Sequence, residues 1–120
     1  MALSLNDRSG CEWLVEAHGC ATGSLQSTSR LEALFAALIA GLGLHPVGKP
    51  TWHQFSGTGG ITGLALLEES HLACHTFPEF GALCLNVFCC RSRPDWEFEA
   101  YLKDSFGASQ VTVRRVERPY

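Results

Sequence analysis

Two short, largely hydrophobic runs lie in the middle of the chain, at residues 64–67 and 83–88. Each has the length of a buried strand, and turn-forming residues bound them: a glycine precedes the first run, and Pro78 and Gly81 precede the second. A looser alternation of apolar and polar residues over 11–17 predicts an earlier strand. The pattern therefore predicts strands that are separated by polar segments.

A helical pattern follows the first of these strands. Ser29, with Glu32 three residues later, predicts an N-cap with a capping box, and Gly41 or Gly43 predicts the helix end. The buried face consists of apolar residues at helical spacing, namely Leu31, Leu34, Phe35, Leu38, Ile39 and Leu42. Packing in the core is a sufficient explanation for this stripe, which implies no cofactor.

A second helix is predicted near the C-terminus. Ser92 is suited to its N-cap, Pro94 to its first turn and Asp95 to the positive end of the helix dipole. Gly107 is suited to its end. Its apolar face consists of Trp96, Tyr101, Leu102 and Phe106.

Two further strands complete the prediction. One spans residues 45–55, interrupted by Pro46 and Pro50, which suit an edge strand, and the other spans residues 110–116. The order β-α-β-β-β-α-β predicts an α+β two-layer sandwich, in which an antiparallel β-sheet carries both helices on one face. With 120 residues, the chain is expected to form a single domain over residues 1–120, whose uncovered sheet face is solvated or packed against a partner.

Composition restricts the possible partners. A net charge of −3, with 46% hydrophobic and 18% charged residues, indicates a globular chain and argues against nucleic-acid binding. The longest apolar stretch, residues 31–44, is shorter than the ~20 residues that a membrane span needs. Residues 1–10 lack the apolar segment of a secretory signal, so the six cysteines are expected to be reduced thiols in a cytoplasmic protein.

Reactive side chains collect between the two central hydrophobic runs. They are Ser70, His71, His75 and, after the second run, Cys90. If the two runs pair as neighbouring strands, Cys90 comes back towards Ser70. A hydroxyl or thiol beside imidazoles permits Ser–His hydrolysis or Cys–His nucleophilic catalysis, whereas a strand end that happens to carry polar residues needs no chemistry.

Three segments around these residues have a recognisable order: Glu-Ser-His at 69–71, His-Thr-Phe-Pro-Glu-Phe-Gly at 75–81, and Asn-Val-Phe-Cys-Cys at 86–90. This order resembles the signature of the small prokaryotic S-adenosylmethionine decarboxylases. That family reads Glu-Ser-His, three residues, His-Thr-aromatic-Pro-Glu-aromatic-Gly, and later an acidic residue, an aromatic residue, Thr and Cys. The spacing matches without a gap over residues 60–90, and the flanking elements fit as well.

The resemblance implies a proenzyme that cleaves itself between Glu69 and Ser70. The Ser70 hydroxyl would attack the preceding carbonyl, and elimination followed by loss of ammonia would leave a pyruvoyl group at the start of the C-terminal chain. In the family pattern, His75 is the base of the elimination. Thr62 stands in the place of a serine hydroxyl that assists processing. No external cofactor is then required.

The resemblance also implies a reaction and a set of contacts. The pyruvoyl group would hold the amine of S-adenosylmethionine as a Schiff base and promote its decarboxylation, which feeds polyamine (spermidine) biosynthesis. Cys90 matches the proton donor of the family. Glu79 matches a carboxylate that binds the ribose, Phe55 lies near an aromatic residue that stacks on adenine, and His71 belongs to the expected substrate-binding set. The family forms dimers, so a homodimer of processed protomers is expected.

Besides Thr62, three positions depart from the family pattern. Cys89 stands where the family has Thr and is expected to face the core. Asn86 replaces an acidic residue, and Arg91 replaces a small residue. If Arg91 points inward, it disfavours a sulfonium substrate and binds a carboxylate instead; otherwise it is exposed at the strand end. A pyruvoyl enzyme acting on a basic amino acid, ornithine or arginine, is therefore the alternative.

Two interpretations come from other classes. The cysteines and histidines at positions 71, 74, 75, 89 and 90 are ligand types for Zn²⁺, but His71 and Cys74 would face opposite ways on a strand, and no metal is expected. An unprocessed homologue that serves only as a dimer partner is the other alternative.

Overall fold

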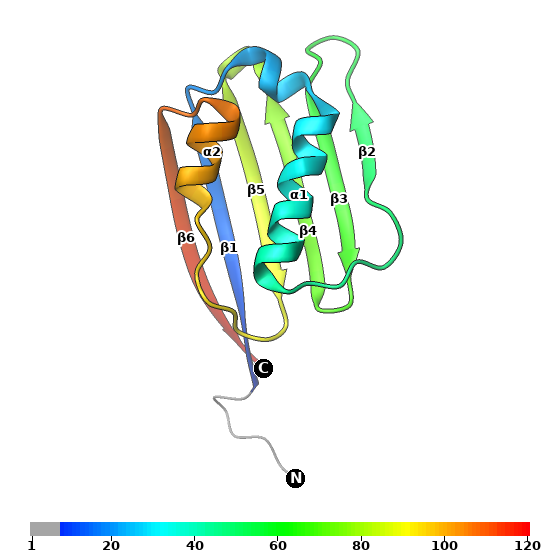
Figure 1. Ribbon diagram of the computed structural model, residues 1–120, viewed down its shortest axis with the longest axis vertical. Coiled ribbons are helices and arrows are strands. Elements are labelled where there is room, and N and C mark those ends of the chain that lie inside the picture. The colour runs from blue at the N-terminus through cyan, green and yellow to red at the C-terminus, as the bar shows by residue number, and fades with distance from the viewer. Residues whose placement is uncertain (1–7) are drawn as a thin grey trace.

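The computed structural model describes residues 8–120 and contains one six-stranded antiparallel sheet that carries both α-helices on one face (Figure 1). The predicted α+β two-layer sandwich is therefore confirmed. The spatial order of the strands is β2-β3-β4-β5-β1-β6. The strands are β1 (Ser9–His18), β2 (Thr51–Gln54), β3 (Ile61–Leu67), β4 (Ser70–Phe77), β5 (Ala82–Cys89) and β6 (Gln110–Pro119). The helices are α1 (Thr28–Leu42) and α2 (Phe98–Phe106), with short 3-10 turns η2 (Thr22–Gln26) and η3 (Pro78–Phe80).

Alternation along each strand separates a covered face from an open face. In β3, Ala65 and Leu67 are buried under the helices, while Leu64 and Leu66 are exposed on the other side. The open face has no second layer among residues 8–120. The largest fully buried side chains of the core between sheet and helices are Trp13, Phe35, Phe98 and Phe106.

Helix α1 has a different N-cap from the predicted one. The cap is Ser27, whose Oγ accepts a hydrogen bond from the backbone N–H of Arg30 at 3.2 Å. The predicted capping box of Ser29 and Glu32 is wrong because both residues already lie inside the helix. Gly43, one of the two predicted glycines, ends the helix in the left-handed conformation with φ of 65°.

Helix α2 begins later than predicted, and Ser92 and Pro94 lie in the loop before it. Arg115 of β6 binds the side chains that were expected at the helix start, since its guanidinium donates to Asp95 at 2.7 Å and to Ser92 at 3.0 Å. The helix ends at Gly107 (φ 68°), as predicted. Neither described helix is long and apolar enough to cross a membrane.

The sheet contains one strand more than predicted, β4, which pairs with β3 on one side and β5 on the other. Its alternation is regular, because Leu72, Cys74 and Thr76 are buried while His71 and His75 are half-buried on the open face. The segment that carries the candidate chemistry is therefore a central strand and not a connection between two strands.

The predicted strand over residues 45–55 is reduced to the short edge strand β2. Pro46 forms only an isolated bridge with Leu67, and proline cannot donate to a ladder. Trp52 of β2 lies opposite Gly63 of β3, where a Cβ atom would come within 2.1 Å of the indole ring. The glycine therefore leaves room for Trp52 to pack against Phe35, with ring centroids 4.7 Å apart.

Candidate active site

The segment that was predicted to be cleaved forms a two-residue turn between β3 and β4. Leu67 pairs with Ser70, and Glu68 and Glu69 form the turn between them. The favoured two-residue hairpin turns have a positive φ at one or both turn residues. Here the positive φ lies at Ser70 (157°), the only non-glycine residue with a positive φ among residues 8–120. The unusual backbone conformation thus coincides with the predicted nucleophile.

The residue that follows β5 binds the carbonyl group that joins Glu69 to Ser70. This oxygen accepts a hydrogen bond from the backbone N–H of Cys90 at 2.8 Å, and Ser70 pairs with Cys89 in the β4–β5 ladder. Cys90 therefore lies close to Ser70, as expected, although the pairing of β4 with β5 brings them together and not a pairing of β3 with β5. Cys89 is fully buried, as expected. We call Glu69, Ser70 and Cys90 the cleavage cluster.

A tyrosine that sequence reasoning missed fixes the backbone at Cys90. The Tyr120 hydroxyl donates to the carbonyl of Cys90 at 2.7 Å, and the Tyr120 backbone N–H donates to the carbonyl of Arg8 at 2.7 Å. The end of β6 is thereby connected to the cleavage cluster. No local motif predicts this contact, since the two residues are 30 positions apart in the chain.

The side chain of Glu69 is hydrogen-bonded to His45. His45, just after α1, donates its backbone N–H to Oε1 at 2.9 Å, and its ring Nδ1 is in hydrogen-bond contact with Oε2. This contact lowers the pKa of the Glu69 carboxyl and raises the pKa of the His45 imidazole. Glu68 adds to the rise at His45, while Arg93 opposes it. Glu69 is therefore held as a carboxylate beside the bond that is predicted to be cleaved.

The His45–Glu69 contact is expected to stabilise the fold most between the ordinary pKa values of the two groups, 4.5 for Glu and 6.5 for His. The contribution of Glu69 is lost as the pH falls through its lowered folded-state pKa. The contribution of His45 is lost as the pH rises through its raised folded-state pKa. His45→Gln should therefore lower the melting temperature most inside this window and less at about pH 3 or pH 9.

Thermal unfolding of an uncut Ser70→Ala protein, with and without His45→Gln, measures this effect across the pH range. His18→Gln, at an exposed histidine at the end of β1, is the matched control. A loss of melting temperature that is the same at every pH would contradict an ionic origin for the His45–Glu69 contact.

A second group of predicted residues lies at the opposite end of the β3–β4 hairpin. Thr62 Oγ1 and His75 Nδ1 are 2.6 Å apart on directly paired positions. The ring centroid of Phe55 lies 5.7 Å from that of His75. Phe55, His75 and Glu79 also line one depression of about 340 Å³. The structure therefore brings together the predicted base, its hydroxyl partner and two predicted substrate-binding residues, which we call the His75 cluster.

The two clusters are far apart within one chain. Ser70 and His75 both lie on β4, five positions apart, which corresponds to about 17 Å at ~3.4 Å per residue. A general base must come within hydrogen-bond reach of the proton that it removes. A single protomer therefore does not place His75 or Thr62 beside Ser70.

The open face carries two further predicted positions. The ring centroid of His71 lies 5.5 Å from that of Phe88. Asn86, where the family pattern has an acidic residue, donates from Nδ2 to Oε2 of Glu12 at 2.7 Å. This hydrogen bond, followed by one from Arg118, lowers the pKa of the Glu12 carboxyl. A carboxylate is therefore present beside position 86, but it comes from β1, which local spacing does not reveal.

The remaining predictions concern Arg91 and a metal site. Arg91 is exposed, which agrees with the interpretation that it is exposed at the strand end. Cys74 is buried on the covered face, whereas His71 and His75 lie on the open face, so these three side chains do not converge on one point. Burial also raises the pKa of the Cys74 thiol to about 12, and a thiol that stays protonated is a poor metal ligand.

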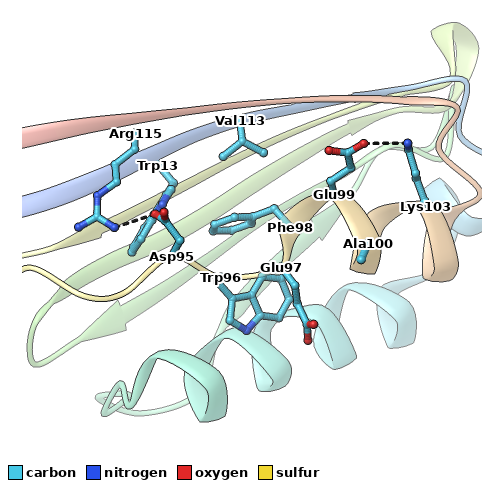
Figure 2. A pocket seen from close by; sticks show the side chains of 10 residues that line it. All are labelled: Trp13, Asp95, Trp96, Glu97, Phe98, Glu99, Ala100, Lys103, Val113 and Arg115. Atoms are coloured by element: carbon cyan, nitrogen blue, oxygen red, sulfur yellow. Dashed lines mark hydrogen bonds and ion pairs between the residues drawn. The ribbon is translucent and has the colours of Figure 1, made fainter.

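A separate depression of about 670 Å³ lies between β6, α2 and the loop before α2 (Figure 2). Trp13 and Trp96 contribute aromatic surface, and Arg115 lies over the Trp13 ring, 5.1 Å from its centroid, while it pairs with Asp95. None of the predicted site residues lines this depression, which is therefore separate from the predicted site.

Known proteins similar to this chain give a consistent result. The sequence model of the S-adenosylmethionine decarboxylase family matches residues 11–119. Proteins of Moorella thermoacetica and Carboxydothermus hydrogenoformans, both named S-adenosylmethionine decarboxylase proenzyme, are 36% and 35% identical over 108 residues. These matches cover 88% of this chain and 83% and 82% of the two relatives. The crystal structure of the adenosylmethionine decarboxylase from Aquifex aeolicus has a TM-score of 0.76 at 21% identity, over 95% of this chain and 93% of that chain, and supports the fold.

Proposed function

Because the chain belongs to the S-adenosylmethionine decarboxylase family, we propose that it is a self-cleaving proenzyme whose mature form decarboxylates S-adenosylmethionine. The observation that carries this proposal is the geometry at Ser70, which follows a carbonyl that already accepts a hydrogen bond from Cys90. The family match over residues 11–119 supports the view that residues 1–120 form one pyruvoyl-decarboxylase domain.

In the proposed cleavage, the Ser70 hydroxyl attacks the Glu69 carbonyl carbon, and the peptide C–N bond breaks as an ester forms. The Cys90 N–H, 2.8 Å from the carbonyl oxygen, stabilises the negative charge that develops there. A base then removes the α-proton of Ser70, and breakage of the Cβ–Oγ bond releases Glu69 as a carboxylate. The remaining dehydroalanine takes up water and loses ammonia, which leaves a pyruvoyl group.

The position of Ser70 fits the group that would be made there, because Ser70 is half-buried at the start of β4 and the carbonyl before it is hydrogen-bonded to the backbone of the half-buried Cys90. The pyruvoyl group supplies an electron sink for the bond to the departing carboxylate. The Cys90 thiol donates the proton that replaces the carboxylate on the substrate. The hydrogen bond from Tyr120 to the Cys90 carbonyl holds the backbone of this thiol in position.

We further propose that a second copy of the chain completes the site. His75 lies about 17 Å from Ser70 of its own protomer, so the base has to come from elsewhere. Two protomers stacked through their open faces, about a two-fold axis perpendicular to the strands, would bring the His75 cluster of one over the cleavage cluster of the other. The contact would also bury Leu64 and Leu66, which are 53% and 61% exposed on that face.

In such a dimer, Phe55, Glu79 and His71 are the proposed substrate-binding residues. Phe55 and Glu79 already line the depression that contains His75, which supports their assignment to the same substrate as the base. A role in polyamine biosynthesis and a cytoplasmic location accompany this proposal, the latter because all six cysteines are free thiols. The alternative substrate, a basic amino acid, has less support because Arg91 is exposed and the relatives are named for S-adenosylmethionine.

Release of labelled CO₂ tests the substrate. The purified protein is incubated separately with carboxyl-labelled S-adenosylmethionine, ornithine and arginine. We expect release from S-adenosylmethionine only. Release from ornithine or arginine alone would establish the amino-acid alternative, and no release from any of the three by a correctly cleaved protein would contradict both.

A further inference from the structure

We propose that Arg93 forms a carboxylate-binding site whose ligand is created by the cleavage itself, namely the α-carboxylate at the new C-terminus, Glu69. This inference rests on the proposed self-cleavage. It assigns a function to an arginine that lies outside the motif over residues 60–90, in the loop between β5 and α2.

Arg93 is a partly buried cation with unused hydrogen-bonding capacity. Its side chain is 23% exposed, and its Nε is buried without a hydrogen-bond partner among residues 8–120. Buried donors that lack a partner are rare in folded proteins because their desolvation is not compensated. The backbone N–H of Arg93 donates to the buried Cys11 Sγ at 3.3 Å, which fixes the loop at this position. The loop that carries Arg93 is therefore anchored, while the guanidinium keeps one buried donor without a partner among residues 8–120.

The guanidinium lies next to the scissile residue. Arg93 Nη2 is 3.9 Å from Oε2 of Glu69, which is too long for a hydrogen bond. The two carboxylate oxygens of Glu69 are already bound by the backbone N–H and the ring of His45. The side chain of Glu69 therefore leaves Arg93 available for a second carboxylate.

Cleavage supplies that second carboxylate at the same residue. Before cleavage, the main chain at Glu69 ends in a neutral carbonyl that accepts one hydrogen bond from Cys90. Elimination breaks the Cβ–Oγ bond of Ser70, and its bonding electrons stay on the oxygen, so Glu69 gains a carboxylate made of its own carbonyl oxygen and the former Ser70 Oγ. Two negative charges on one residue repel each other unless a cation lies between them. An arginine, with five N–H donors in a fixed plane, suits this position.

Labelling with glutamate that carries ¹³C at C1 isolates the new group. In the uncut chain every glutamate C1 is an amide carbonyl, which does not titrate. After cleavage the C1 of Glu69 becomes a carboxyl group while the other glutamates keep their amides, so the titrating C1 signal comes from Glu69. In the mature wild type, we expect the pKa of this carboxyl to lie below the ordinary α-carboxyl range of about 3.3–3.7. In Arg93→Gln, we expect the pKa to rise by about 1 unit. Arg91→Gln, which changes an exposed arginine two positions away, should leave the titration unchanged.

Each other outcome overturns the inference in a distinguishable way. If Arg93→Gln cleaves normally and the titration of the new carboxyl group is unchanged, Arg93 does not bind that group, although self-cleavage still occurs. An Arg93→Gln chain that does not cleave places Arg93 in the cleavage reaction and not on its product. A wild-type chain without any titrating C1 signal contradicts the self-cleavage, and with it the carboxylate.

The carboxylate of the substrate is the other chemically similar ligand near Ser70. If Arg93 binds that group instead, Arg93→Gln should raise the KM for S-adenosylmethionine by about 10-fold or more and leave the C1 titration at its wild-type position. Our assignment expects the opposite: a shifted titration with the KM nearly unchanged.

Discussion

Replacing Ser70 with alanine is expected to leave the chain in one piece and to abolish decarboxylation. The Ser70 hydroxyl is the proposed nucleophile for the Glu69 carbonyl, and without it neither the ester nor the pyruvoyl group can form. The intact mass of the denatured protein should show a full-length chain for Ser70→Ala and two fragments, split between Glu69 and Ser70, for the wild type. The release of labelled CO₂ should fall by about 10⁶-fold or more, because the electron sink is never made.

The matched control is Ser56→Ala, which changes an exposed serine in the turn between β2 and β3 and should cleave as the wild type does. Ser70→Ala should keep the fold, because Ser70 pairs with β3 and β5 through its backbone. If the Ser70→Ala chain were still split before residue 70, another group would be the nucleophile. If the wild-type chain remained whole, the protein would be an unprocessed homologue.

Strand β4 illustrates why hydrophobic patterning predicted the architecture but one strand too few. Thr76 is buried in the core although it is polar, because its Oγ1 donates to the carbonyl of Leu25 at 2.7 Å and accepts from the backbone N–H of Ile61 at 2.8 Å. These partners come from η2 and β3, so their contribution is not visible in the sequence of β4 itself. Buried and half-buried residues therefore alternate along β4, but hydrophobicity alone does not show this because the buried Thr76 is polar.

The predicted start of α2 was wrong for a related reason. Ser92 and Asp95 have the right chemistry for a helix N-terminus, but Arg115 on β6 binds both side chains. The helix ends at Gly43 and Gly107 were predictable, because a left-handed residue is required there whatever packs against it. The sequence thus predicted where a left-handed residue ends a helix. It did not predict that a distant residue would bind the side chains expected at a helix start.

The candidate site was likewise predictable only in part. The motif identified the candidate residues, and its spacing predicted that Cys90 lies close to Ser70. It did not reveal the contacts that cross between strands, such as Glu12 with Asn86 or Tyr120 with Cys90. Nor did it reveal the separation of the two clusters, which follows only once β4 is recognised as an extended strand.

That separation predicts a specific result when two defective variants share one dimer. Alone, His75→Ala should form the pyruvoyl chain about 10²–10⁴-fold more slowly than the wild type, because the proposed base of the elimination is missing. Alone, Ser70→Ala should not be cut. In a mixed dimer, the His75→Ala chain provides an intact Ser70 and receives His75 from the Ser70→Ala chain, so it should mature while its partner stays whole.

Co-expression of the two variants with tags of different mass allows each chain to be followed by mass spectrometry. With random pairing about half of the His75→Ala chains lie in mixed dimers, and about half should therefore carry a pyruvoyl group. In the matched control the partner carries both Ser70→Ala and His75→Ala, no His75 is present in any dimer, and maturation should return to the slow rate of His75→Ala alone. If His75→Ala chains stay uncut in both mixtures, His75 acts within its own chain. A rearrangement of β4 before cleavage would then have to close the distance of about 17 Å between Ser70 and His75.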